Sequence, residues 1–185
     1  MSGRGPGSDP FLELGDAARL DEEIAARGER RSRLSRASEV ATWAGTLEDL
    51  VERRQQAVVR MAGGHAYRGT LVALGRDHLA VRSRGHQVAL LHLAAIRIIR
   101  PEPGSAVPVA TGDRERSDGR TIREVLGLLA EERARVVLGL GEVDDLLAGV
   151  LVGLAEDVIT LQVDGGDADV LFLPLGAVHE LLLER

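Results

Sequence analysis

The sequence predicts an α+β, mainly β fold in which two five-stranded antiparallel barrels follow each other in tandem. An α-helix precedes each barrel, and a charged helical region precedes both. Three observations support this prediction: an internal similarity between two stretches of the chain, a helix-start signal before each stretch, and short apolar runs separated by turn residues.

The internal similarity joins a stretch that begins at Gly69, GTLVALGRDHLAV, to one that begins about eighty residues later at Gly149, GVLVGLAEDVITL. The glycines, the apolar positions and the aspartates Asp77 and Asp157 coincide. A repeat of this kind is one structural unit used twice. A glycine inside a strand often marks a bend, so we expect the second strand of each unit to bend there.

Each unit has its own helix-start signal. Thr121 with Glu124 three residues later matches a capping box, and Thr46 with Asp49 is a variant of it, so a helix is predicted to begin at each threonine. Apolar residues at helical spacing mark the buried face of each helix. They are Trp43, Leu47, Leu50 and Val51 in the first unit and Ile122, Val125, Leu126 and Leu129 in the second.

Five short apolar runs follow each helix, and turn residues separate them. Without intervening helices they cannot form a parallel sheet, because parallel strands need long crossover connections. A small, strongly bent antiparallel sheet that closes into a barrel fits this pattern. The predicted strands lie near Ala57–Met61, Tyr67–Leu74, His78–Ser83, Gln87–Leu93 and Ile96–Ile99, and near Arg135–Leu140, Leu147–Leu154, Val158–Val163, Asp169–Leu173 and Val178–Leu183.

Composition divides the chain into five segments. They are a disordered start (1–10), a charged helical region (11–44), a basic first module (45–100), a Pro- and Gly-rich linker (101–120) and an acidic second module (121–185). Residues 45–100 carry nine Arg against four acidic residues, a net +5, and residues 134–185 carry two Arg against ten acidic residues, a net −8. Either the basic module binds a polyanion such as nucleic acid, or the two modules attract each other within or between chains.

Several classes of site are disfavoured by composition. The chain has no Cys, so disulfides, zinc–thiolate sites and thiol nucleophiles are excluded. Aromatic residues make up 2% of the chain, too few to favour single-strand binding by base stacking. The start lacks the apolar segment of a secretory signal, and no apolar run reaches the roughly 18 residues of a membrane span. We therefore expect a cytoplasmic protein with no membrane partner.

The sequence offers no convincing catalytic, cofactor or metal site. Four of the five histidines fall on different predicted turns and strands of the first module, so they do not predict a metal site. The acidic turn at 164–169 lacks the spacing of a calcium-binding loop. The serines lie mostly in the N-terminal region and the linker, which are poor supports for catalysis. We expect no enzyme activity.

One helix followed by five short strands, with a glycine in the second strand, resembles the Sm-like fold of the Sm, LSm and Hfq superfamily. Residues 67–79 and 147–159 follow the outline of the first Sm motif, and the segments that end at Ile96 and Val178 stand where the second motif would lie. The chain as a whole also resembles uncharacterised proteins of GC-rich bacteria, which implies no activity. The Sm-like resemblance implies assembly through strand edges.

The chain departs from the Sm pattern at the RNA-binding loops. Neither copy has the family's Asn after the Asp turn, and His92 is the only second-motif candidate, with Pro174 as its counterpart. The resemblance therefore does not extend to the family's nucleotide pocket.

The sequence thus predicts a non-enzymatic scaffold that associates with itself or with another protein through strand edges. The alternative is a regulatory RNA- or DNA-binding protein that uses the basic first module. In that alternative the phosphate contacts come from Arg60, Arg68, Arg76, Arg82 and Arg84.

Overall fold

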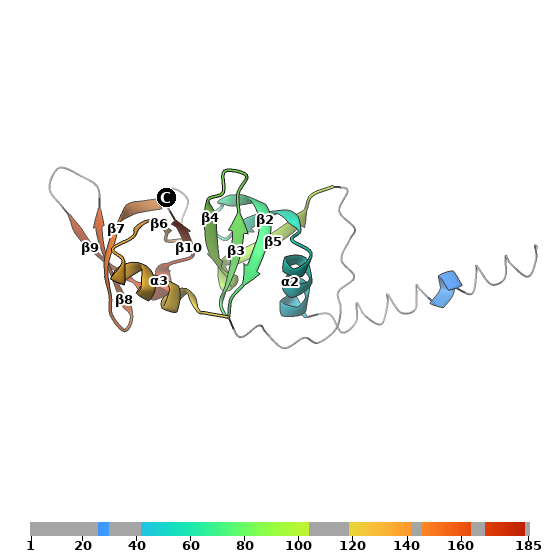
Figure 1. The fold of residues 1–185 in the computed structure, drawn as a ribbon, viewed down its shortest axis with the longest axis horizontal. Helices are drawn as coiled ribbons and strands as arrows, with labels where there is room; N and C mark the ends of the chain where they lie inside the picture. Colours follow the sequence, from blue (N-terminus) through green and yellow to red (C-terminus); the bar gives the residue numbers. More distant parts are fainter. Residues whose placement is uncertain (1–25, 30–41, 104–118, 142–145, 164–168, 184–185) are drawn as a thin grey trace, which may run out of the picture.

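The structure, a computed structural model, describes residues 26–29, 42–103, 119–141, 146–163 and 169–183 (Figure 1). The predicted disorder at 1–10, residues 104–118 of the linker predicted at 101–120, and residues 164–168 of the acidic turn at 164–169 lie outside these residues. Of the charged region before α2, residues 26–29 are described and are helical.

One helix followed by five strands occurs twice, in the same order. We call residues 42–103 the first half and residues 119–183 the second half. The predicted strand positions are confirmed to within a few residues at each end. The first half contains α2 (Trp43–Glu52), β1 (Gln56–Met61), β2 (Ala66–Leu74), β3 (His78–Arg82), β4 (Val88–His92), the 3-10 helix η1 (Leu93–Ala95) and β5 (Ile96–Pro101); the second contains α3 (Ile122–Glu131), β6 (Arg135–Gly139), β7 (Leu146–Leu154), β8 (Val158–Val163), β9 (Val170–Pro174), the 3-10 helix η2 (Leu175–Ala177) and β10 (Glu180–Leu183).

The strands form one open antiparallel sheet in the order β5-β1-β2-β3-β4-β10-β6-β7-β8-β9. This confirms the mainly β, α+β class. The sequence predicted two separately closed barrels, whereas the strand pairing gives one sheet that runs through both halves. The reason is that β4 and β6, which would each leave one side unpaired, both pair with β10.

The second strand of each half has the same irregularity. The pairing of β2 with β3 shifts register just after Leu71, and the pairing of β7 with β8 shifts just after Leu151. Two residues earlier stand Gly69 and Gly149, where the neighbouring strand leaves no space for a side chain. A Cβ on Gly69 would lie 2.7 Å from the carbonyl carbon of Arg82, and Gly149 meets β8 in the same way.

The helix starts agree with one of the two predicted caps. Thr121 and Glu124 form the predicted capping box of α3, and the backbone hydrogen bond from Thr121 lowers the pKa of the Glu124 carboxyl. The predicted start at Thr46 is wrong: α2 begins one turn earlier, where the Thr42 hydroxyl accepts the Gly45 amide at 3.0 Å. Thr46 lies inside the helix and donates its hydroxyl to the Thr42 carbonyl at 2.9 Å. Thr42, directly before Trp43, supplies the capping hydroxyl that was predicted to come from Thr46.

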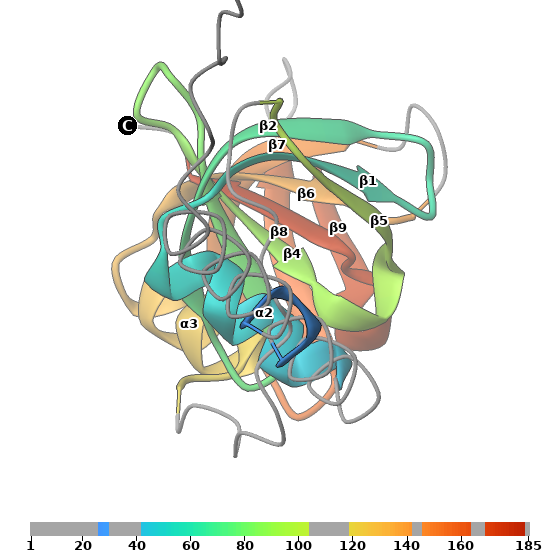
Figure 2. The same ribbon diagram turned by 90° about the vertical axis from the view of Figure 1, so that its right-hand side faces the viewer.

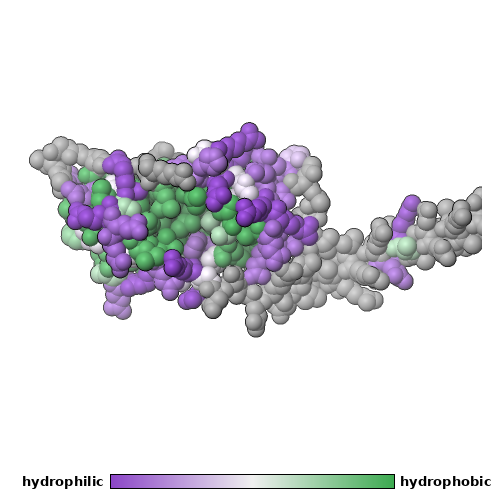
Figure 3. Space-filling model, in the orientation of Figure 1, coloured by the Kyte–Doolittle hydropathy of each residue, from purple (hydrophilic) through white to green (hydrophobic). Residues whose placement is uncertain are grey.

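The two halves lie side by side along the long axis of the folded part (Figure 1). Viewed from the end of the first half, α2 and α3 lie on the same side of the strands (Figure 2). In a space-filling view, apolar residues gather in the middle of the folded part and hydrophilic residues surround them (Figure 3). The halves are therefore in contact.

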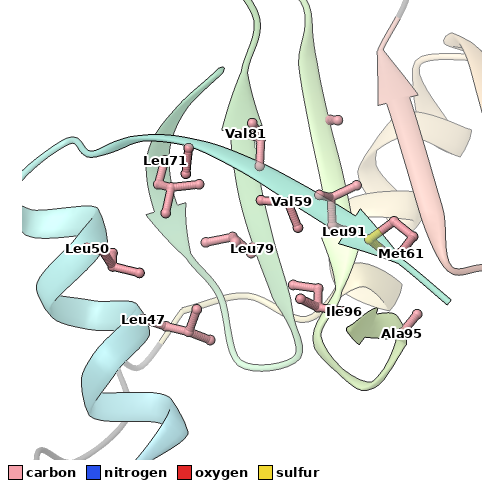
Figure 4. Close-up of a cluster of buried hydrophobic side chains, with 12 residues drawn as sticks. Leu47, Leu50, Val59, Met61, Leu71, Leu79, Val81, Leu91, Ala95 and Ile96 are labelled. Atoms are coloured by element: carbon pink, nitrogen blue, oxygen red, sulfur yellow. The ribbon is translucent and has the colours of Figure 1, made fainter. Parts of the chain in front are cut away.

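Each half has its own apolar cluster. In the first, Leu47 and Leu50 of α2 point toward the strands (Figure 4). In the second, Leu126 of α3 packs on strands β6 to β10. The clusters are shared across the halves, because Ala80 and Leu90 of the first half belong to the second cluster. Burial of apolar surface is the main stabilising term of a fold, so this sharing ties the halves together.

Candidate interaction surfaces

The pairing of β4 with β10, which we call the inner junction, joins the strands of the two halves into one sheet. Leu91 lies opposite Glu180, Leu90 opposite Leu181, and Ala89 opposite Leu182. Leu90 and Leu181 are both buried in the second apolar cluster. The inner junction therefore combines a backbone ladder with cross-strand apolar pairs, the usual source of stability in a sheet.

A buried carboxylate lies at one end of the inner junction, where β10 begins. The Glu180 side chain is 1% exposed, and its Oε2 lies 2.8 Å from Nδ1 of His65 and accepts the Tyr67 hydroxyl at 2.6 Å. Both partners come from the first half. A buried carboxylate is costly unless it is hydrogen-bonded, so these two contacts hold β10 in this register beside β4.

Burial raises the pKa of the Tyr67 hydroxyl above its ordinary value of 10.0, and the hydrogen bond to Glu180 and the charge of that carboxylate raise it further. At a pH just above 10, the folded chain therefore retains the Tyr67 phenolic proton, whereas the unfolded chain loses it. A raised pKa of this kind adds stability below the ordinary value, and the added stability is lost as the pH rises above it.

We therefore expect the free energy of unfolding to fall as the pH rises above about 10. Tyr67→Phe should flatten this alkaline decrease, because it removes the titrating group. Tyr67 is the only tyrosine of the chain, so phenolate absorbance reports its ionisation alone. A native-state titration near the ordinary pKa, with equal alkaline slopes for the two chains, would contradict this prediction.

A second contact joins the halves at the start of α3. The Asp77 carboxylate, in the turn between β2 and β3, accepts the amide of Ile122 at 2.8 Å. Nearby, the Arg76 amide donates to the Arg120 carbonyl at 3.1 Å. Gly75 makes this approach feasible, because a Cβ there would lie 2.6 Å from the Arg120 carbonyl oxygen. The first half therefore supplies part of the cap of α3.

The two ends of the sheet order, β5 and β9, are its outer edges. Apolar side chains are exposed on both: Ile98 on β5 is 54% exposed, and Val170 and Phe172 on β9 are 47% and 72% exposed. Single exposed apolar residues are common on protein surfaces. Here they lie on the two edge strands, which carry backbone groups able to pair with another strand.

A hollow of about 230 Å³ lies beside the β5 edge. Val58, Arg60, Ile98 and Arg100 line it. Arg60 lies opposite Ile98, and Val58 opposite Arg100, in the β1–β5 pairing. The hollow thus combines an apolar floor with two exposed guanidinium groups.

Of the five arginines proposed as phosphate contacts, Arg60, Arg68 and Arg82 lie on one face of adjacent strands. Arg60 is opposite Ala66 and Arg82 is opposite Thr70, the alternate positions on either side of Arg68 in β2. Arg60, on β1, and Arg68, on β2, are exposed, and Arg68 pairs with Glu102 at 3.2 Å. Arg82 ends β3, and Arg84 lies in the turn that follows it. Arg76 stands at the opposite end of β2 and lines a cavity of about 480 Å³ at the start of α3.

The histidines also have separate settings. His65 contacts Glu180, and Nδ1 of His78 lies 3.1 Å from the Asp77 carboxylate. Within the described residues, no group of three or more His, Asp and Glu side chains is arranged to hold a metal ion. Sequence reasoning missed the pair Glu180 and Tyr67. The only available signal was an acidic residue within an otherwise apolar final strand.

No protein-family model matches this chain, and neither a curated protein nor a solved structure matches it. Among the described residues, no helix is long and apolar enough to cross a membrane. The strand edges and their chemistry are therefore the basis for a functional conclusion.

Proposed function

We propose that this chain is a non-enzymatic interaction protein, a scaffold built from two Sm-like modules that takes up further strands at its outer edges β5 and β9. The inner junction carries the proposal. In this junction β4, the fourth strand of the first half, pairs with β10, the fifth strand of the second half, with apolar cross-strand pairs and a shared core. The same two kinds of strand, β9 and β5, end the sheet without such a partner in its order.

The exposed side chains of the edges support the same function. A strand edge that remains in water is usually protected by charge or by a covering element. On β9, Val170 and Phe172 are apolar and exposed instead, and Ile98 is exposed on β5. Aromatic residues that are exposed in the free protein are frequent anchors of protein interfaces.

Nucleic-acid binding by the first half is the second candidate. The exposed Arg60, Arg82 and Arg84 and the net +5 of residues 45–100 favour it. Against it, Arg76 lies at the opposite end of β2 from Arg68, and Arg68 is already paired with Glu102. The scaffold is therefore the better supported of the two.

Edge association is tested by measuring the molar mass over a range of chain concentrations. We expect the mass to exceed that of a single 19.8-kDa chain, and Phe172→Glu and Ile98→Glu each to reduce it. Leu128→Glu is the matched control, because Leu128 is apolar and 42% exposed but lies on α3, away from the edges. A buried carboxylate without a partner is strongly unfavourable, so only the edge variants should respond.

A chain that stays monomeric at every concentration, with equal behaviour of all variants, would overturn the proposal. Binding of an unrelated duplex by the wild type at low salt, weakened by Arg82→Ala with Arg84→Ala, would favour nucleic-acid binding instead.

A further inference from the structure

We infer that the partner of each outer edge is a second copy of this chain, joined head to tail with β9 of one copy paired to β5 of the next in the register of the inner junction. This inference rests on the proposed edge association and names its partner. Head-to-tail pairing leaves one β5 edge and one β9 edge free, so a dimer can still grow.

The register follows from the equivalence of the two halves. Leu91 and Leu173 occupy equivalent positions, since they lie opposite Leu79 and Ile159 in the β3–β4 and β8–β9 pairs. Likewise Ile99 is equivalent to Leu181, because they lie opposite Val59 and Leu138 on the equivalent strands β1 and β6. Transposing the inner junction then places Ile98 opposite Leu173, Ile99 opposite Phe172, and Arg100 opposite Leu171.

The exposed face of β9 is the equivalent of a face that the inner junction covers. In the first half, Val72, Ala80, Val88 and Leu90 pack against the second apolar cluster. Their equivalents in the second half are Val152, Thr160, Val170 and Phe172. The last two are exposed, which is the expected state of an interface whose partner is absent.

The hollow beside β5 is the corresponding receiving site. Its lining residues Val58, Arg60, Ile98 and Arg100 are equivalent to Val137, Gly139, Glu180 and Leu182. In the second half these positions face the first half: Glu180 contacts Tyr67, and Leu182 packs against the first apolar cluster. The hollow therefore lies at the position equivalent to the surface of the second half that contacts the first half.

The two junctions differ in chemistry, and this difference favours the correct partner. The polar pair of the inner junction, Glu180 with Tyr67, is equivalent to Ile98 with Leu147, an apolar pair. The outer contact is therefore held by apolar side chains, without a buried carboxylate. The side chains of β10 thus complement those beside β4, and the side chains of β5 complement those beside β9. Exchanging the two fifth strands would place a polar side chain against an apolar one.

Charge also favours head-to-tail contact. The net charge is +5 on residues 45–100 and −8 on residues 134–185, so unlike surfaces meet only when β9 faces β5. In the transposed register Asp169 lies on the diagonal from Arg100, on the same face of the sheet. Contacts of β5 with β5, or of β9 with β9, would bring like charges together.

The cap of α3 predicts one further contact. Asp77 accepts the amide of Ile122, the first residue of α3. Asp157 is equivalent to Asp77. The backbone carbonyl of Asp157 accepts the amide of Leu175, just as the carbonyl of Asp77 accepts the amide of Leu93. The exposed Asp157 carboxylate therefore faces the start of α2 of the next copy.

Disulfide trapping tests the register, because the chain has no native Cys. Arg100→Cys and Leu171→Cys chains are mixed and oxidised, and we expect a mixed cross-linked dimer. Its positive control is Ala89→Cys with Leu182→Cys in one chain, the equivalent pair of the inner junction. Its negative control is Arg100→Cys with Val170→Cys, because a shift of one residue points the side chain to the opposite face.

Association is measured in parallel by sedimentation. Phe172→Glu should weaken it about tenfold or more, the loss expected for an interface anchor. Asp157→Ala should weaken it by a smaller factor, and raised salt should weaken it in the wild type.

The outcomes separate this inference from the proposed function. Association without the mixed disulfide, or with dimers that form only from Arg100→Cys alone or Leu171→Cys alone, would overturn the head-to-tail register and leave edge association standing. A monomer at every concentration would overturn both.

Discussion

Glu180→Ala is expected to lower the free energy of unfolding by about 2–4 kcal/mol, because it removes a buried charged acceptor and leaves its partners unpaired. The Glu180 side chain is 1% exposed and bonds to both His65 and Tyr67 across the inner junction. Chemical denaturation of the two chains measures the difference. The pairing of β10 with β4 should weaken together with the global stability.

Two variants serve as controls for Glu180→Ala. Glu180→Gln retains an oxygen that accepts from Tyr67, so it should destabilise less than alanine does. Glu102→Ala removes the partly exposed pair with Arg68, and exposed ion pairs contribute roughly 0–1 kcal/mol. Equal stability of Glu180→Ala and the wild type would show that the carboxylate does not hold the junction.

Gly149→Ala and Gly69→Ala are each expected to cost roughly 3 kcal/mol, as strong overpacking does. The added Cβ would meet the backbone of the neighbouring strand, at 3.0 Å from the Gln162 carbonyl carbon in one case and 2.7 Å from that of Arg82 in the other. Backbone cannot move aside like a flexible side chain. The strands must therefore separate, which breaks the ladder next to the register shift.

Gly153→Ala is the matched control on the same strand as Gly149. A Cβ there would lie 3.6 Å from the Thr160 side chain, an ordinary contact. This change should therefore alter the stability by less than about 1 kcal/mol. Similar losses for Gly153→Ala and Gly149→Ala would mean that general glycine effects, and not close approach, determine the stability.

Local patterns predicted the local structure. The capping box at Thr121 and the positions of the strands depend on residues a few places apart, and both are confirmed. The start of α2 was misplaced because Thr46 has an acidic residue three places later and Thr42 does not. Thr42 caps the helix with its hydroxyl alone, so the capping-box pattern favoured the wrong threonine.

The inner junction could not be predicted in the same way. Residues of β4 and β10 are far apart in the chain, and no periodicity specifies which of several apolar strands pair. Nothing in the sequence distinguished Glu180 from an exposed acidic residue, because its burial depends on partners from the other half. The separation of Arg76 from Arg60, Arg68 and Arg82 also depends on the tertiary arrangement, because all of them lie within one short stretch of sequence.

The position of β10 between β4 and β6 has a kinetic consequence. Leu91 and Glu180 lie about ninety residues apart, whereas paired strands inside each half are separated by about forty residues at most, as in the pairs Ala57 with Pro101 and Gly139 with Glu180. Closing so long a loop carries a larger entropic cost, and contacts of this kind slow folding. Each half should thus fold before β10 pairs with β4. Substitutions of Glu180 should therefore accelerate unfolding far more than they slow folding. Until that last step, β4 remains an exposed template on which a neighbouring chain can dock its own β10, so rapid refolding at high concentration should yield exchanged dimers.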